Sequence, residues 1–154
     1  MRLTLYTDYA LRVLMYVGVK APELATIGEI AEQFDTSKNH LMKVVHELGQ
    51  RGYLETVRGK HGGMRLARKP RHINIGAVVR DTEEDLAVVG CLQQEGYCPI
   101  ERVCELRLAL REATHAFLGV LDRYTLEDLI RPRRPLSKLL AIELPEAGTR
   151  QALG

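Results

Sequence analysis

The three cysteines of the chain lie close together, as Cys91, Cys98 and Cys104. Thiolates are good ligands for iron, copper and zinc. The spacing C-x6-C-x5-C is wider than that of common zinc sites, and Gly96 and Pro99 favour a loop that can surround a group larger than one ion. These residues by themselves leave three interpretations open: free or buried thiols, an iron–sulfur cluster, or a zinc site.

Three thiols are too few for a closed four-coordinate site, and the sequence offers no obvious fourth ligand nearby. His115 lies roughly 16 Å beyond Cys104 along a helix, and position 107 is an arginine, which does not bind metals. The local carboxylates are Glu95, Glu101 and Glu105. Asp8 is a distant candidate, and the residues alone favour a structural interpretation, in which a carboxylate in the first helical turn suits the helix dipole and pairs with Arg12.

The bulk composition suits one globular domain with an appended element, because 45% of the 154 residues are hydrophobic. Asp8 and Arg12 interrupt the apolar run at the amino terminus, and no small-residue cleavage site follows. We therefore expect neither a signal peptide nor a membrane span. A cytoplasmic protein is expected, in which the three thiols stay reduced.

The net charge of +2 is unevenly distributed along the chain. Lysine and arginine outnumber acids nine to two between positions 37 and 72, whereas acids outnumber basic residues seven to one between 81 and 105. The first segment is a candidate surface for the phosphates of nucleic acid. A basic face that is merely solvated is the alternative.

The segment before the cysteines predicts a helix-turn-helix. We expect a first helix over 8–20 capped by Thr7, and a short helix opened by the capping box Thr26-x-x-Glu29. After a turn at 35–37, Ser37 is expected to cap a longer, basic helix that ends at Gly52. In such motifs the second helix enters the major groove. Its expected DNA contacts are Ser37, Lys38, Asn39, His40 and Lys43.

A β-hairpin is predicted directly after this helix, with strands over 53–57 and 64–67. The pair Gly62-Gly63 is expected to supply the positive φ angles of its tip, which carries basic side chains. A basic hairpin in this place is typical of a wing that lies along a minor groove. Its expected DNA contacts are Arg58, Lys60, His61, Gly62 and Arg65. An exposed loop without a partner is the alternative.

After a short helix predicted over 73–80, the cysteines precede the longest periodic pattern in the chain. Apolar side chains step by three and four at Val103, Leu106, Leu110, Ala113, Phe117, Val120 and Tyr124. Packing against the same helix of a second subunit would bury this face and give a homodimer with two DNA-binding heads. Packing against the first helix of the same chain is the alternative.

The predicted fold class is mainly α with a small β-hairpin, a winged helix-turn-helix plus a long dimerisation helix. We expect a winged helix-turn-helix domain over 1–80, a cluster-binding loop over 81–104, and the dimerisation helix with a following short helix over 105–130. The stretch Thr125-Leu-Glu-Asp128 should cap that short helix. Over 131–154 we expect a tail, in which prolines at 132 and 135 break regular structure and the last residues are poorly ordered.

Six stretches together carry a family resemblance. They are MRLTLYTDYALRVLMY, TSKNHLMKVVHELGQRGY, VRGKHGGMRLA, INIGAVVRDTE, the cysteine segment GCLQQEGYCPIERVCEL, and FLGVLDRYTLEDLI. The chain resembles the Rrf2 family of bacterial winged-helix regulators over roughly residues 1–142, and within it the nitric-oxide-sensing repressors. The resemblance implies a homodimer in which the long helices of the two subunits cross.

The resemblance also implies a cofactor and its ligands. An iron–sulfur cluster, 4Fe-4S with 2Fe-2S as the alternative, would be held by Cys91, Cys98 and Cys104. The fourth ligand would be Asp8 of the partner subunit. The cluster-biogenesis regulators of the family instead use a histidine three residues after the last cysteine, where this chain has Arg107.

The function that follows as an expectation is a transcriptional repressor. It would bind a double-stranded DNA operator while its cluster is intact and release it when nitric oxide reacts with the cluster. A cluster-biogenesis-type or general redox regulator is the alternative. An enzyme is not expected, because the chain has no Cys-x-x-Cys pair, no dinucleotide-binding loop and no Ser/His/Asp signature.

Overall fold

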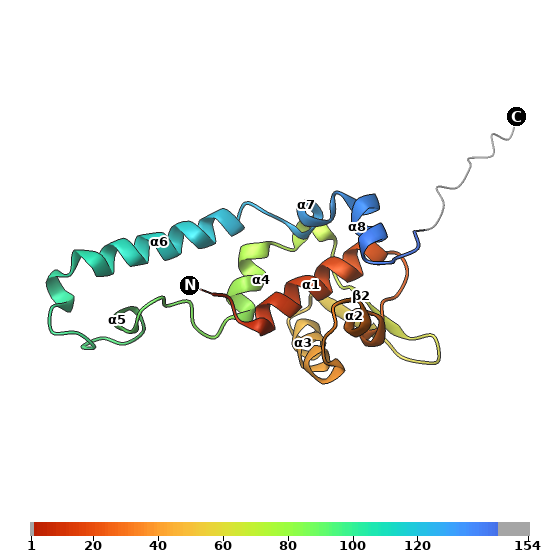
Figure 1. Cartoon of the computed structure of the whole chain (residues 1–154), viewed down its shortest axis with the longest axis horizontal. Coiled ribbons are helices and arrows are strands. Elements are labelled where there is room, and N and C mark those ends of the chain that lie inside the picture. Colours follow the sequence, from red (N-terminus) through yellow and green to blue (C-terminus); the bar gives the residue numbers. More distant parts are fainter. Residues whose placement is uncertain (1, 145–154) are drawn as a thin grey trace, which may run out of the picture.

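The computed structural model describes residues 2–144, which fold into helices and one short hairpin (Figure 1). The elements, in chain order, are α1 (Leu5–Lys20), α2 (Ile27–Gln33), α3 (Lys38–Gln50), β1 (Leu54–Val57), β2 (Gly63–Leu66), the 3-10 turn η1 (Pro70–His72), α4 (Ile75–Thr82), α5 (Gly90–Gln93), η2 (Glu101–Val103), α6 (Glu105–Leu121), α7 (Leu126–Ile130) and α8 (Arg133–Leu139). The predicted fold class is confirmed.

Helix α1 runs through the centre of the domain, with α2, α3 and the hairpin on one side and α7 on the other (Figure 1). The predicted cap, Thr7, was wrong. The cap is Thr4, whose hydroxyl accepts the Thr7 backbone N–H at 3.2 Å. Thr7 itself is buried inside the first turn and donates to the Thr82 hydroxyl at 3.0 Å. The start of α1 is thus fixed to the end of α4.

The helix-turn-helix forms as predicted. Thr26 and Glu29 make both hydrogen bonds of the capping box of α2. In α3 the inner face is fully buried and consists of Leu41, Val44, Val45 and Leu48. Ser37 occupies the N-cap position of α3, but its side chain makes no capping hydrogen bond. Hydrophobic burial of one face therefore stabilises α3 more than its cap does.

Strands β1 and β2 pair antiparallel, with Glu55 opposite Arg65. The pair Gly62-Gly63 was predicted to supply the positive φ angles of the tip. This prediction was wrong, because the residue with a positive φ angle at the tip is Gly59, at 119°. Gly62 and Gly63 are needed for space instead. A Cβ on Gly62 would lie 2.3 Å from the Val57 carbonyl oxygen, and one on Gly63 would lie 2.6 Å from a backbone oxygen of the loop before α2.

Helix α6 projects from the body of the domain, and the cysteine segment lies at its far end (Figure 1). Its main contacts are with α4 and α5, so the alternative of packing along α1 is not supported within residues 2–144. Leu118 is the one residue of α6 that is buried. The predicted apolar pattern extends beyond the helix, because Val103 lies in η2 and Tyr124 follows the helix end.

The capping box of Thr125 and Asp128 forms as predicted and begins α7. The predicted break at 131–135 was too long, because α8 already begins at Arg133. Pro135 lies in the first turn of that helix, where a proline costs no backbone hydrogen bond. The expectation for the last residues concerns 145–154, which lie outside the described residues. Over 2–144, no helix is both long and apolar enough to cross a membrane.

Candidate DNA-binding surface and cysteine segment

The residues predicted to contact DNA from α3 are all exposed. Ser37, Lys38, Asn39, His40 and Lys43 lie at the N-terminal end of the helix, and Asn39 and Lys43 are on the side opposite its buried face. The core fixes the orientation of the helix while this end stays free to enter a groove. The structure therefore supports the required exposure, and contact with DNA stays a prediction.

The tip of the hairpin carries the exposed side chains of Arg58, Lys60 and His61. Arg65 differs from them, because its guanidinium lies 3.0 Å from the carboxylate of Glu55 on the opposite strand. This ion pair lowers the pKa of the Glu55 carboxyl. The charge of Arg65 is therefore largely offset, and Lys60 and Arg58 are the stronger candidates for phosphate contacts.

Other basic residues of the segment 37–72 serve the fold. Arg51 pairs with Glu47 at 2.8 Å. Arg68 lies 4.7 Å from the ring centre of Tyr53 and donates to the backbone oxygens of Arg51 and Gly52 at 2.9 and 2.8 Å. The charge count from the sequence therefore overstated the number of cations that are free to meet phosphates.

The three cysteines occupy three different local structures. Cys91 lies in α5, Cys98 in the following loop, and Cys104 at the N-cap position of α6. All three thiols are free and half-buried. Across the described residues, no three His, Cys, Asp or Glu side chains converge in an arrangement that could hold a metal ion. One chain with this loop conformation therefore does not gather the predicted ligands.

Arg107 and Glu101 hold the cysteine segment against α6. Arg107 Nη2 lies 2.9 Å from Glu101 Oε1, and Arg107 Nε donates to the Cys91 carbonyl at 3.0 Å. Glu101 also accepts the backbone N–H of Gly96 at 2.7 Å. Sequence reasoning considered Arg107 only as a residue that cannot bind metal, and nothing in the local pattern indicates that it anchors the loop.

The donor set nevertheless fits an iron–sulfur cluster. Three free thiols within one short segment are the ligands such clusters use, and a carboxylate can complete the set. Asp8 forms the predicted ion pair with Arg12, with Nη2 2.9 Å from Oδ2 and Nε 3.1 Å from Oδ1. Its side chain is 40% exposed. Asp8 is accessible to a second subunit, although Arg12 must release or share it.

Comparison with known proteins decides the family. A family model described as an iron-dependent transcriptional regulator, Rrf2, matches residues 3–132. The chain belongs to the Rrf2 family. It is 50% identical to the HTH-type transcriptional regulator NsrR of Bacillus subtilis (strain 168), over 93% of this chain and 99% of that protein. It is 54% identical to NsrR of Geobacillus kaustophilus (strain HTA426), over 91% of this chain and 97% of that protein.

Two solved structures have the same fold as this chain. CymR, the global cysteine regulator of B. subtilis, matches with a TM-score of 0.67 and 27% identity over 86% of this chain and 98% of that chain. IscR of T. potens matches with a TM-score of 0.68 over 86% of this chain and 88% of that chain, at 21% identity. As an Rrf2 protein, the chain is a DNA-binding transcriptional regulator and not an enzyme, as predicted.

Proposed function

We propose that the chain is a cytoplasmic, homodimeric repressor that holds an iron–sulfur cluster and releases its operator DNA in response to nitric oxide. One observation carries the proposal: the chain keeps three free, half-buried cysteines and is 50% and 54% identical to two NsrR proteins over more than nine-tenths of its length. The motif resemblance to the nitric-oxide-sensing repressors of the family supports the same function.

The proposed ligands are Cys91, Cys98 and Cys104 of one subunit and Asp8 of the partner subunit, around a 4Fe-4S cluster, with 2Fe-2S as the alternative. When bound, the cluster supplies iron atoms that react with nitric oxide. A carboxylate is a harder ligand than a thiolate and is the weaker partner for iron, so the Asp8 bond is the first that we expect to be lost. Arg107 argues against a histidine-ligated site, because it stands three residues after Cys104 and its guanidinium is held by Glu101.

The exposed face of α6 supports the homodimer. Val103 is 80% exposed and Leu106 is 65% exposed, and Val120 and Tyr124 continue this face at the other end of the helix. Large apolar side chains that line one side of a projecting helix are typical of an interface between subunits. A two-fold dimer through α6 would also let the first helix of one subunit approach the cysteines of the other.

Each subunit would then present one α3 and one hairpin to double-stranded DNA. Lys38 and Lys43 are suited to phosphate or guanine contacts, and Asn39 and His40 to base edges in the major groove. Arg58, Lys60 and His61 at the hairpin tip are suited to the adjacent minor groove. Two such heads related by a two-fold axis match a pseudo-palindromic operator.

The decisive experiment is anaerobic purification followed by iron and sulfide assays, an absorption spectrum, and operator binding measured before and after nitric oxide. We expect iron and sulfide in the protein, an absorption change on adding nitric oxide, and a loss of operator affinity. Protein without iron or sulfide, or with full operator affinity after nitric oxide, would overturn the proposal.

A matched pair of variants tests the fourth ligand. Asp8→Ala should change the absorption spectrum of the cluster and its response to nitric oxide. Glu23→Ala, at an exposed carboxylate in the loop after α1, should match the wild type. Identical spectra for Asp8→Ala and wild type would remove Asp8 from the ligand set.

A further inference from the structure

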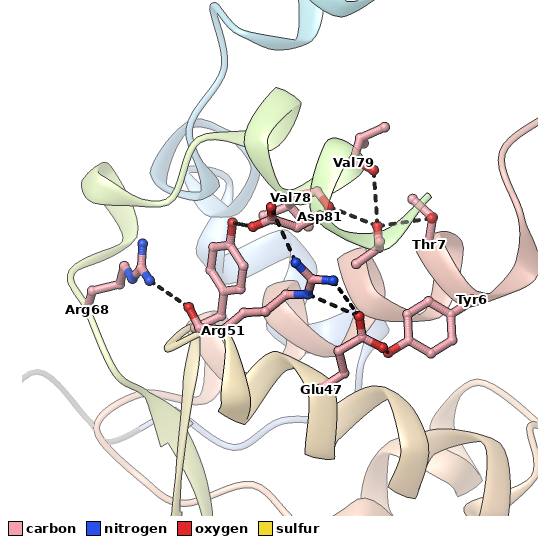
Figure 2. A network of polar contacts seen from close by, with 10 residues as sticks. Tyr6, Thr7, Glu47, Arg51, Arg68, Val78, Val79 and Asp81 are labelled. Atoms are coloured by element: carbon pink, nitrogen blue, oxygen red, sulfur yellow. Dashed lines mark hydrogen bonds and ion pairs between the residues drawn. The ribbon is translucent and has the colours of Figure 1, made fainter. Parts of the chain in front are cut away.

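The ends of three helices meet in one polar network, which Figure 2 shows from close by. The first turn of α1 contributes Tyr6 and Thr7, the last turn of α3 contributes Glu47, and the last turn of α4 contributes Asp81. Arg51, the residue that follows α3, lies between the two carboxylates. The network therefore joins the DNA-reading helix to two elements that lead toward the proposed cluster.

The link from α1 to α3 is the hydrogen bond from the Tyr6 hydroxyl to Glu47 Oε2, at 2.6 Å. Glu47 Oε1 accepts two bonds from Arg51, at 3.0 Å from Nε and 2.8 Å from Nη2. A short bond from a neutral hydroxyl to a carboxylate is stronger than a bond between neutral groups. Burial and the Glu47 carboxylate both raise the pKa of Tyr6, so its hydroxyl keeps its proton and donates at neutral pH.

The link from α3 to α4 runs through Asp81. Tyr53, at the base of the hairpin, donates to Asp81 Oδ2 at 2.6 Å, and Arg51 Nη1 lies 3.6 Å from Asp81 Oδ1. Burial and the bond to Asp81 raise the pKa of Tyr53 to about 12, so this hydroxyl also stays protonated. The end of α3 and the start of the hairpin are thus held by the same carboxylate of α4.

The ends of α1 and α4 are also bonded directly. Besides the buried pair of Thr7 and Thr82, Glu83 Oε1 accepts from the backbone N–H and the hydroxyl of Thr4, at 2.8 and 3.0 Å. Beside these bonds lies an open pocket of about 590 Å³, lined in part by Tyr6, Glu47 and Asp81. The pocket gives the charged side chains of the network room to change partners.

We infer that Tyr6 and Glu47 are positioning residues that set the orientation of α3 according to the state of the first turn of α1. Tyr6 lies two residues before Asp8 in that turn, and α4 leads directly into the segment that carries the cysteines. A shift of the first turn moves Tyr6, and Tyr6 moves the end of α3. Because α3 is a continuous helix, a change at Glu47 tilts Lys38, roughly 14 Å away along the axis.

This inference rests on the proposed function, because the state of the first turn depends on whether Asp8 holds the partner's cluster. To the proposed function it adds the route by which a loss of the Asp8 ligand would reach the DNA-binding helix α3. Two sites are coupled only when each biases the same two arrangements of an intervening element. In this protein that element is the junction of α1, α3 and α4.

The test compares operator affinity before and after nitric oxide in the wild type, in Tyr6→Phe and in Tyr16→Phe. Tyr16 lies on the same helix and packs its ring against Phe34, and its hydroxyl makes no hydrogen bond within residues 2–144. We expect the ratio of the two dissociation constants to fall about fivefold or more in Tyr6→Phe, the size of a typical coupling between sites. Tyr16→Phe should keep the wild-type ratio.

Iron content, the absorption spectrum and the unfolding midpoint of the apoprotein are measured in the same variants. A purely structural role for Tyr6 would lower the midpoint and leave the ratio of dissociation constants unchanged. Supporting the inference requires a reduced ratio with the wild-type iron content and spectrum.

Failure of the inference and failure of the proposed function give different results. If the wild type binds its operator equally before and after nitric oxide, the proposed function fails. If the wild type responds and Tyr6→Phe responds with the same ratio, the inference alone is wrong. Should Tyr6→Phe not retain its cluster, Glu47→Ala removes the acceptor of the same hydrogen bond from the side of α3, and a wild-type ratio in that variant likewise overturns the inference.

Discussion

Arg107 and Glu101 form an ion pair of 2.9 Å whose side chains are only 20% and 12% exposed. Most of the other ion pairs within residues 2–144 lie on the surface, where solvent weakens them. Here the pair closes the loop that contains Cys98, and Arg107 also holds the Cys91 carbonyl. The loop is therefore partly ordered by the protein itself, which would reduce the entropy cost of binding the proposed cluster.

Removing this anchor should loosen the loop. In Arg107→Ala we expect chymotryptic cleavage of the apoprotein after Tyr97, which is 66% exposed, to become about tenfold faster, the equivalent of roughly 1.4 kcal/mol. Arg102→Ala, an exposed position nearby, should be cleaved at the wild-type rate. The iron taken up on reconstitution should fall in Arg107→Ala. Equal cleavage rates in the two variants would show that Arg107 does not order the loop.

The sequence was sufficient to predict the helix-turn-helix, the hairpin and the long helix, because their apolar residues repeat with the period of the element. It was not sufficient for contacts between distant segments. Thr4 and Thr7 are both suitable caps, and only the bond from Thr7 to Thr82 in α4 decides between them. The same limit applies to Arg107, because its partners depend on how the loop folds and not on a repeating pattern.

In the candidate site, too, features that follow from a repeating pattern were predictable and contacts between distant residues were not. Exposure of the α3 side chains was predictable, since buried Leu41, Val44, Val45 and Leu48 fix which face points outward. The pairing of Arg65 was not, because it depends on the strand register that sets Glu55 opposite it. The roles of Asp8 and the cysteines as ligands shared between two subunits stay predictions.

Gly76 is predicted to be essential for the contact between α4 and the end of α6. A Cβ at this position would lie 2.0 Å from Asp122 Oδ1, and Asp122 is held by Arg80 at 2.6 and 2.7 Å. Gly76→Ala must displace Asp122, so we expect a loss of about 1–3 kcal/mol in the free energy of unfolding. Urea unfolding of the apoprotein measures it.

Gly28→Ala is the matched control for this prediction. A Cβ on Gly28, in helix α2, would lie 3.8 Å from its nearest atoms, Lys38 Nζ and Thr26 Oγ1, which is an ordinary van der Waals contact. We expect this variant to be at least as stable as the wild type, because alanine favours helix over glycine by about 1 kcal/mol. If both variants unfold at the wild-type urea concentration, the close approach of Gly76 to Asp122 does not contribute to the free energy of unfolding.

Lys60 and Arg65 should differ in their effect on DNA binding, although both belong to the hairpin. Lys60→Ala removes an exposed, free cation and should reduce the slope of log affinity against log salt by about one unit. Arg65 is paired with Glu55, so Arg65→Ala should reduce this slope less than Lys60→Ala does. Lys138→Ala in α8 should leave the slope unchanged, and the same result for Lys60→Ala would remove that residue from the interface.

Glu47 should make the stability of the apoprotein depend on pH on the acid side. The hydrogen bond from Tyr6, followed by that from Arg51, lowers the pKa of Glu47 in the folded state. Its contribution to stability is therefore fully present above the pKa of an unfolded glutamate, about 4.3, and is lost as the pH falls through the lower folded value. In Glu47→Gln, the urea midpoint should be lower at pH 7 and should fall less steeply between about pH 5 and 3. Glu23→Gln, at an exposed position, should follow the wild-type curve, and a Glu47→Gln curve parallel to wild type would show that the bonds from Tyr6 and Arg51 do not stabilise the carboxylate.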